Sequence, residues 1–301
     1  MIRHWPLRIA ASALAPLLLF HPASSCANAI ALPAETRLAH ISVVKLGHGD
    51  PVVLIPGLSS PRAVWDGVAP GLARAHTVYL VQINGFAGDA PGANITPGLL
   101  AGIVADLDTY LAREQAGAVP VVGHSLGGLV ALMTARAHPA RVSRLMIVDS
   151  LPYIGLLFSP AATVPLVEPQ AKTMRDAIAA TYGKPADPAA AERTANGLAS
   201  KPASRAAVKA YAMAADPRVT AEALYEDMTT DLRPDLPRIE VPITLVYPAP
   251  AAGPDRGETL YKRAYATAPH VVFVPIADSA HFVMLDQPAA FRAALDAFLA
   301  A

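Results

Sequence analysis

A serine at position 125 lies in the sequence GHSLG (residues 123–127), after a short apolar run and before a stretch with the apolar spacing of a helix. A serine hydroxyl becomes a nucleophile when it is exposed on a sharp turn, a histidine accepts its proton and an acid orients that histidine. The flanking glycines permit strained backbone and close approach of neighbouring chain. We therefore predict that Ser125 is a nucleophile; the alternative is an ordinary glycine-rich turn between a strand and a helix.

Two other segments match motifs that accompany such a serine. They are LIPGLSS at residues 54–60 and DSAHFVMLDQP at residues 278–288. Together with GHSLGG they resemble the α/β-hydrolase superfamily, in its esterase and lipase-like branch with a helical cap. The resemblance covers nearly all of residues 30–301, in the family's chain order of serine, acid and histidine. It implies an α/β-hydrolase fold.

The resemblance also implies roles for further positions. His281 takes the place of the base, in a loop before the terminal helix. The backbone N–H groups of Leu58 and Leu126 take the place of the oxyanion hole, which stabilises the negative charge that develops during acyl transfer. Pro56 stands where many relatives have histidine, so Ser59 is the one residue of this loop that could donate from a side chain.

The acid departs from the family's common pattern, which places an aspartate directly after the penultimate strand. Here the segment ITLVY is followed by PAPAAGP, and the first acidic residue is Asp255. Asp149 ends the strand after the nucleophile helix, where some capped members carry their acid. We favour Asp149 and keep Asp255 as the alternative. Asp255 could instead cap the next helix, and Asp149 could instead fix the entrance of the cap.

Three more residues near these motifs are expected to support the site. His124, beside the serine, is expected to point away from the turn and to be structural. Asp278 and Asp286 flank His281 and could steady its loop.

The elements that must position these residues alternate between strand and helix. We predict strands in residues 40–58 (two, joined by a Gly-Asp turn), His76–Ile83, Val119–Val122, Leu145–Val148, 241–248 and Val271–Pro275. We predict helices at Pro97–Ala116, Gly127–His138, Glu258–Ala266 and from Pro288 onward. Because the strands are apolar without alternation, both their faces must be covered. This predicts the α/β class, with a mostly parallel central sheet and helices on both faces.

Residues 151–239 interrupt this alternation. The segment is rich in Ala and Pro, with helix-like pieces and no convincing strand. We predict an inserted helical cap here, in a core formed by residues 30–150 and 240–301; the alternative is a disordered linker.

Residues 1–29 have the layout of a secretory signal. Arg3 and Arg8 precede the uncharged run Ile9–Phe20, which is too short for a stable membrane span, and an Ala-x-Ala pattern predicts cleavage after Ala29. The single cysteine, Cys26, lies inside this segment, in a poor context for a lipid anchor. We therefore expect a periplasmic or secreted protein.

Composition excludes several classes. The chain has 301 residues, 53% hydrophobic and 16% charged, with a formal net charge of +0. It is therefore not expected to be disordered or to bind nucleic acid. No H-E-x-x-H, Cys/His spacing or helix-opening G-x-G-x-x-G occurs, so we expect neither a metal nor another cofactor.

These features predict an exported serine hydrolase that cleaves a carboxylic ester through an acyl-enzyme. The apolar segment LPYIGLLF (151–158) suggests an apolar acyl pocket, or packing inside the cap, and hence a small-molecule ester with an apolar acyl part. A serine nucleophile argues against dehalogenases and epoxide hydrolases, which need a carboxylate there. An aminopeptidase or amidase, with Glu168, Glu192 or Glu222 binding an amine, and a C–C hydrolase are alternatives. A non-catalytic ligand-binding protein is a lower alternative.

Overall fold

The computed structural model describes Met1 and residues 34–252 and 256–301. The predicted signal segment, with Cys26 and the cleavage site after Ala29, lies outside the described residues. So does Asp255, the alternative acid. The fold below is that of residues 34–301.

A mostly parallel sheet forms the centre of this fold. Its strands are β1 (Glu35–Arg37), β2 (Ile41–Gly47), β3 (Asp50–Ile55), β4 (His76–Ile83), β5 (Val119–His124), β6 (Val142–Val148), β7 (Ile243–Ala249) and β8 (Val271–Ala277). The order across the sheet is β1-β2-β4-β3-β5-β6-β7-β8. β2 is antiparallel to β1 and to β4, and the remaining pairs are parallel. The predicted α/β class is confirmed.

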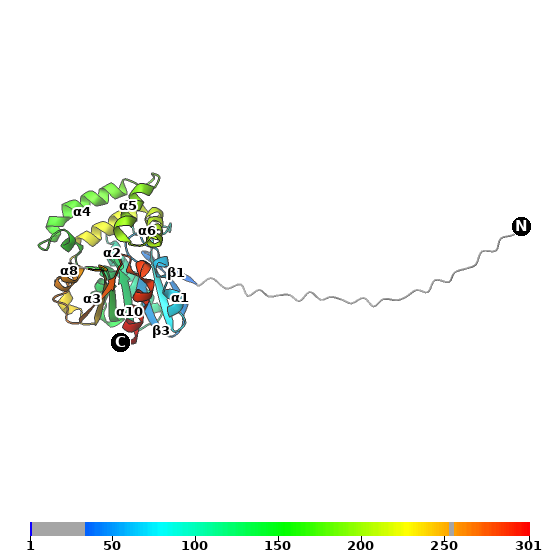
Figure 1. Cartoon of the computed structure of the whole chain (residues 1–301), viewed down its shortest axis with the longest axis horizontal. Helices are drawn as coiled ribbons and strands as arrows, with labels where there is room; N and C mark the ends of the chain where they lie inside the picture. Colours follow the sequence, from blue (N-terminus) through cyan, green and yellow to red (C-terminus); the bar gives the residue numbers. More distant parts are fainter. Residues whose placement is uncertain (2–33, 253–255) are drawn as a thin grey trace. The chain divides into compact units, whose positions relative to one another are not determined.

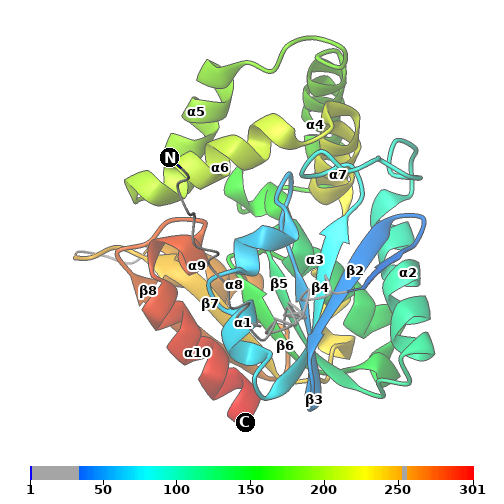
Figure 2. The same cartoon turned by 90° about the vertical axis from the view of Figure 1, so that its right-hand side faces the viewer.

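Helices cover both faces of the sheet. They are α1 (Ala69–Leu72), α2 (Leu99–Arg113), α3 (Leu126–Ala137), α8 (Arg256–Ala264), α9 (Val283–Asp286) and α10 (Pro288–Ala300), with short 3₁₀ turns at Arg62–Trp65, Pro139–Arg141, Ile154–Leu157 and Leu236–Arg238. Figure 2 shows α1 and α10 on one face and α2 and α3 on the other. Neighbouring residues of β5 divide between the two cores, since Val121 packs with α2 and α3 whereas Val122 packs with α1 and α10. This two-sided burial explains the uninterrupted apolar runs.

The segment between β6 and β7 is helical. It contains α4 (Val164–Ala179), α5 (Pro188–Leu198), α6 (Pro202–Ala214) and α7 (Pro217–Thr229), which we call the helical insert. α4 packs against α7, and α5 against α6. Figures 1 and 2 show the insert at one end of the sheet. Backbone hydrogen bonds connect the segment to that end: Leu232 N–H donates to Pro152 O, and Phe282 N–H donates to Leu198 O.

The start of α2 differs from its predicted start at Pro97. Gly98 has a φ of 93°, so the helix begins at Leu99. The carboxylate of Glu226, on α7, accepts hydrogen bonds from the N–H groups of Gly98, Leu99 and Leu100 at 2.5, 2.9 and 2.8 Å. The cap of this helix therefore comes from a distant part of the sequence.

Among the helices that the structure describes, each is too short or too polar to cross a membrane.

Candidate active site

Ser125 occupies a strained turn. β5 ends at His124 and α3 begins at Leu126, which leaves Ser125 alone between them with φ 53° and ψ −123°. A residue with a side chain rarely adopts a positive φ, so the surrounding structure must hold it there. The Ser125 N–H donates to Val148 O at 2.9 Å, and its carbonyl accepts from Gly128 N–H at 2.7 Å. The turn is thus anchored to β6 and to α3.

The glycines around Ser125 are required by close backbone contacts. A Cβ atom at Gly123 would lie 2.1 Å from the carbonyl oxygen of Gly127. A Cβ atom at Gly127 would lie 2.4 Å from the carbonyl oxygen of Ile55. Gly57 lies against the serine itself, since a Cβ atom there would be 3.0 Å from Ser125 Cβ. The end of β3 and the start of α3 therefore meet at Ser125.

The structure brings His281 and Asp149 together. Asp149 follows β6 with a φ of 46°, and His281 lies between β8 and α9. His281 Nδ1 is 2.7 Å from Asp149 Oδ2, and because a carboxylate only accepts, Nδ1 carries the proton. Tyr261 donates its hydroxyl to Asp149 Oδ1. Both carboxylate oxygens therefore have donors, and the Nε2 atom of His281 is left as the basic nitrogen.

These contacts determine the ionisation of Asp149, whose side chain is only 10% exposed. Burial alone would raise the pKa of this carboxyl, but the charge of His281 and hydrogen bonds from His281 and Tyr261 outweigh it and lower the pKa below its usual range. Asp149 is therefore ionised at neutral pH.

His281 is held at its backbone on both sides. His124 is fully buried, and burial, together with the charge of His281, lowers its pKa to about 3, so it is neutral. Its Nε2 atom donates to the His281 carbonyl oxygen at 3.0 Å. Asp286 accepts the Ala280 N–H at 2.9 Å. Asp278 instead binds the side chains of Lys201 and Gln287 at an exposed position.

Ser125 and His281 lie near each other but form no hydrogen bond within the described structure. The ring of His281 lies 4.6 Å, centroid to centroid, from the ring of His124, which precedes the serine. Catalytic hydrogen bonds are often long without substrate and tighten in the complex. Proton transfer from Ser125 to His281 would therefore require the two side chains to come within hydrogen-bond distance.

Two backbone N–H groups beside Ser125 are open. Leu58 follows Gly57, which lies against Ser125, and Leu126 is the first residue of α3. Neither N–H has an acceptor among the described residues. The Ser59 hydroxyl, in contrast, is hydrogen-bonded to the hydroxyl of Thr220 on α7 at 2.9 Å. Both N–H groups that the sequence assigned to the oxyanion hole are therefore without an acceptor in the described part of the chain.

A second buried acid, which the sequence did not indicate, lies near His281. Asp227, on α7, is 8% exposed and makes no hydrogen bond or ion pair with any described residue. Burial raises its pKa to about 7, although the charge of His281 acts in the opposite direction. Asp227 lies on a helix that is distant in sequence from every motif, so no pattern in the sequence indicated it.

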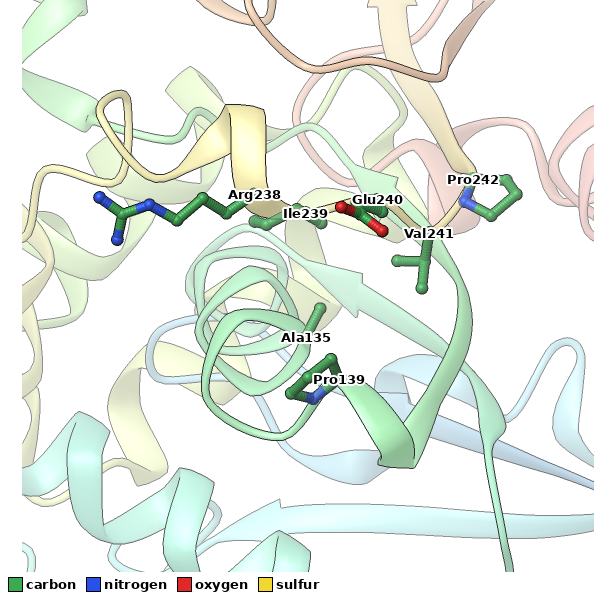
Figure 3. Close-up of a pocket in the computed structure, with 7 residues that line it drawn as sticks. All are labelled: Ala135, Pro139, Arg238, Ile239, Glu240, Val241 and Pro242. Carbon is green, nitrogen blue, oxygen red and sulfur yellow. The ribbon is translucent and has the colours of Figure 1, made fainter.

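Two surface hollows have linings that do not include Ser125, Asp149 or His281. One has a volume of about 520 Å³. Its lining residues, shown in Figure 3, are Ala135, Pro139, Arg238, Ile239, Glu240, Val241 and Pro242. It lies at the end of α3 and the start of β7, whereas Ser125 and Asp149 follow the carboxyl ends of their strands. A second, of about 180 Å³, lies in the insert and is lined by Phe158, Ser159, Ala162, Leu166, Val167 and Gln170. Among the described residues, no group of three His, Cys, Asp or Glu side chains could hold a metal ion.

The chain belongs to the alpha/beta hydrolase family. The sequence model of that family matches residues 52–294, which contain Ser125, Asp149 and His281. The fold and the strained serine turn agree with this membership.

Individual relatives include esterases. Over 116 residues the chain is 40% identical to a pimeloyl-[acyl-carrier protein] methyl ester esterase of Aeromonas hydrophila, a match that spans 37% of this chain and 42% of that relative. The match therefore spans less than half of the relative's length. A thermophilic esterase from Thermogutta terrifontis has a similar structure, with a TM-score of 0.72, 22% identity and coverage of 88% of this chain and 98% of that one. An enol-lactonase from Burkholderia xenovorans LB400 has a TM-score of 0.70, 18% identity and coverage of 87% and 96%. The two structures establish the fold.

Proposed function

We propose that the protein is a serine hydrolase that cleaves a carboxylic ester with Ser125, His281 and Asp149. The observation that carries the proposal is the 2.7 Å contact between His281 Nδ1 and the Asp149 carboxylate, beside a serine on a strained turn. The esterase relatives support the ester as the bond that is cleaved.

The proposed reaction has two halves. Ser125 Oγ attacks the ester carbonyl while His281 Nε2 takes its proton, and the N–H groups of Leu58 and Leu126 stabilise the negative oxygen of the tetrahedral intermediate. His281 then gives the proton to the leaving alcohol, and an acyl-enzyme remains on Ser125. Water, activated by His281 in the same way, releases the acid. Asp149 keeps the proton of the imidazole on Nδ1 and stabilises the imidazolium.

For the substrate we propose a small-molecule ester with an apolar acyl part. Leu157 and Phe158, in the apolar segment that opens the insert, are exposed by 61% and 60%, and Phe158 lines the smaller hollow. We also propose that the protein is exported to the periplasm or secreted. The charge and apolar pattern of residues 1–29 is the support for export.

The alternative of an aminopeptidase is less well supported. Two of the acids considered for binding an amine have surface partners: Glu168 pairs with Lys172 at 2.8 Å and Glu192 with Lys209 at 3.0 Å. Glu222 is buried on α7, where Arg175 acts on it. These contacts do not assemble an amine site from the three residues.

The test is the hydrolysis of p-nitrophenyl butyrate by the purified protein and by Ser125→Ala. We expect turnover in the first and loss of at least about 10³-fold in the second, since the oxyanion donors alone leave only a small residual rate. Turnover that survives in Ser125→Ala would show that another group is the nucleophile. Comparison of butyrate esters with matched aminoacyl amides would reveal an aminopeptidase.

A further inference from the structure

Helix α7 of the insert passes over the proposed site. Near its start, Thr220 is hydrogen-bonded to Ser59, the neighbour of the proposed oxyanion donor Leu58. Asp227 lies seven residues later, where the charge of His281 acts on it. Residues seven apart share one face of a helix and are about 10 Å apart along its axis. One face of α7 therefore extends from the neighbour of Leu58 toward His281.

The other acids near the ends of α7 have clear structural partners. Asp216 accepts the Arg218 N–H at 2.9 Å and caps the helix, and Glu226 caps α2. Asp227, adjacent to Glu226, has no such partner within the described part of the chain, although it is 8% exposed. The carboxyl oxygens of Asp227 are not among the fully buried atoms that lack a partner, so they lie within its small exposed fraction and a ligand can reach them. Structural capping explains Glu226 but not Asp227.

The charges near Asp227 indicate what would satisfy it. Asp149 is already paired with His281, and no described lysine or arginine acts on the Asp227 carboxyl. Among the described residues, Asp227 is therefore an acid at this site with which no lysine or arginine pairs. A ligand group that donates a hydrogen bond, above all a positively charged one, is favoured there, and a carboxylate is repelled.

The position beside His281 indicates which half of the ester this group belongs to. In the proposed reaction His281 gives its proton to the leaving alcohol, so a carboxyl near His281 lies on the leaving-group side. We propose that Asp227 is a specificity residue that binds a hydrogen-bond donor, most strongly a protonated amine, on the alcohol part of the ester. This inference rests on the proposed function and narrows its substrate class.

The test uses butyrate esters that differ in one group of the alcohol. 2-(Dimethylamino)ethyl butyrate carries a cationic donor, 3-hydroxybutyl butyrate a neutral donor, 2-carboxyethyl butyrate an anion, and 3-methylbutyl butyrate is the neutral isostere. Release of butyrate at about pH 8, above the pKa of about 7 that burial gives Asp227, gives kcat/KM for each ester. We define the selectivity ratio as kcat/KM for the amine ester divided by that for the neutral isostere.

We expect the wild-type selectivity ratio to exceed 1, with the hydroxyl ester intermediate and the carboxylate ester poorest. Asp227→Asn should lower the ratio about 10- to 100-fold, the range of a charge-assisted hydrogen bond. Glu222→Gln is the matched control, because Glu222 is 9% exposed on the same helix but Arg175 acts on it; it should leave the ratio unchanged. An unchanged ratio in Asp227→Asn, or an equal fall in both variants, would overturn the proposal. A wild type that prefers the carboxylate ester would do the same.

A binding measurement separates this inference from the proposed function. N-[2-(dimethylamino)ethyl]butanamide and N-(3-methylbutyl)butanamide are amide analogues of the amine ester and its isostere, and calorimetry with Ser125→Ala gives their affinities without turnover. The amine analogue should bind more tightly, and Asp227→Asn in the same background should remove the difference. Absent ester hydrolysis with a preserved affinity difference would refute the proposed function and keep the cation site. Equal affinities for both analogues would refute the Asp227 site.

Discussion

Replacement of Asp149 by asparagine tests how the proposed acid acts. In the structure, Asp149 Oδ1 accepts the Tyr261 hydroxyl and Oδ2 accepts His281 Nδ1–H at 2.7 Å. Asparagine has one oxygen that accepts and one NH₂ group that donates. Because Tyr261 favours the amide oxygen on its own side, the NH₂ group faces His281. Nδ1 must then accept, the ring proton moves to Nε2, and His281 can no longer take the proton of Ser125.

The expected loss follows from this wrong tautomer. We expect Asp149→Asn to lower kcat for p-nitrophenyl butyrate by about 10⁴-fold, which corresponds to about 5 kcal/mol in the barrier. Tyr261→Phe in this background frees the amide to turn its oxygen toward His281 and should restore activity by about tenfold. Tyr261→Phe alone keeps the aspartate and should lose about tenfold or less. The double variant is therefore expected to be more active than Asp149→Asn.

Steady-state kinetics and thermal unfolding of the three variants make the comparison. A double variant no more active than Asp149→Asn would refute the proposed role of Tyr261 in orienting the amide. A loss below about tenfold in Asp149→Asn would contradict the role of Asp149 itself. In that case Asp255→Asn should show the large loss instead.

Three further predictions concern stability and pH. The pKa of Asp227 is raised to about 7 in the folded state, so between about pH 4 and 7 the folded state holds a proton that the unfolded state has lost, and stability falls as pH rises. In urea unfolding at a series of pH values, Asp227→Asn should gain stability relative to wild type across that interval, with no further gain above it. A stability difference that stays constant with pH would contradict this. Gly127→Ala should destabilise the folded protein by about 3 kcal/mol or more, because its Cβ would lie 2.4 Å from the Ile55 carbonyl oxygen. Its control is Gly197→Ala, in open space on α5, which should be neutral or stabilising by up to about 1 kcal/mol. Equal effects of the two variants in urea unfolding would argue against the backbone contact. Glu226→Ala should cost about 1–2 kcal/mol by removing the cap of α2, and an unchanged melting temperature would show that the cap contributes nothing.

The sheet and the serine turn could be predicted because their signals are local. Strand β4 lies at His76–Ile83, as its uninterrupted apolar run predicted, and the apolar run before Ser125 lies in β5. β1, α1 and α9 were missed because each has only three or four residues, too few for a periodic pattern.

Parts of the site could not be predicted because they depend on contacts between distant segments. The sequence could only rank Asp149 against Asp255, whereas the structure places Asp149 against His281, 132 residues away in the chain. Two further residues come from helices with no motif around them. They are Tyr261, the second donor to Asp149, and Asp227, on which the charge of His281 acts. The burial that raises the pKa of Asp227 exists only once α7 has packed over the core.

The central claim, that Ser125 is an activated nucleophile, is tested most directly by covalent labelling. A fluorophosphonate probe should attach to the purified protein, and peptide mapping by mass spectrometry should place the adduct on Ser125. Ser125→Ala should not be labelled, and Asp149→Asn should be labelled far more slowly. An adduct on another residue, or no adduct on a folded wild-type protein, would contradict the account.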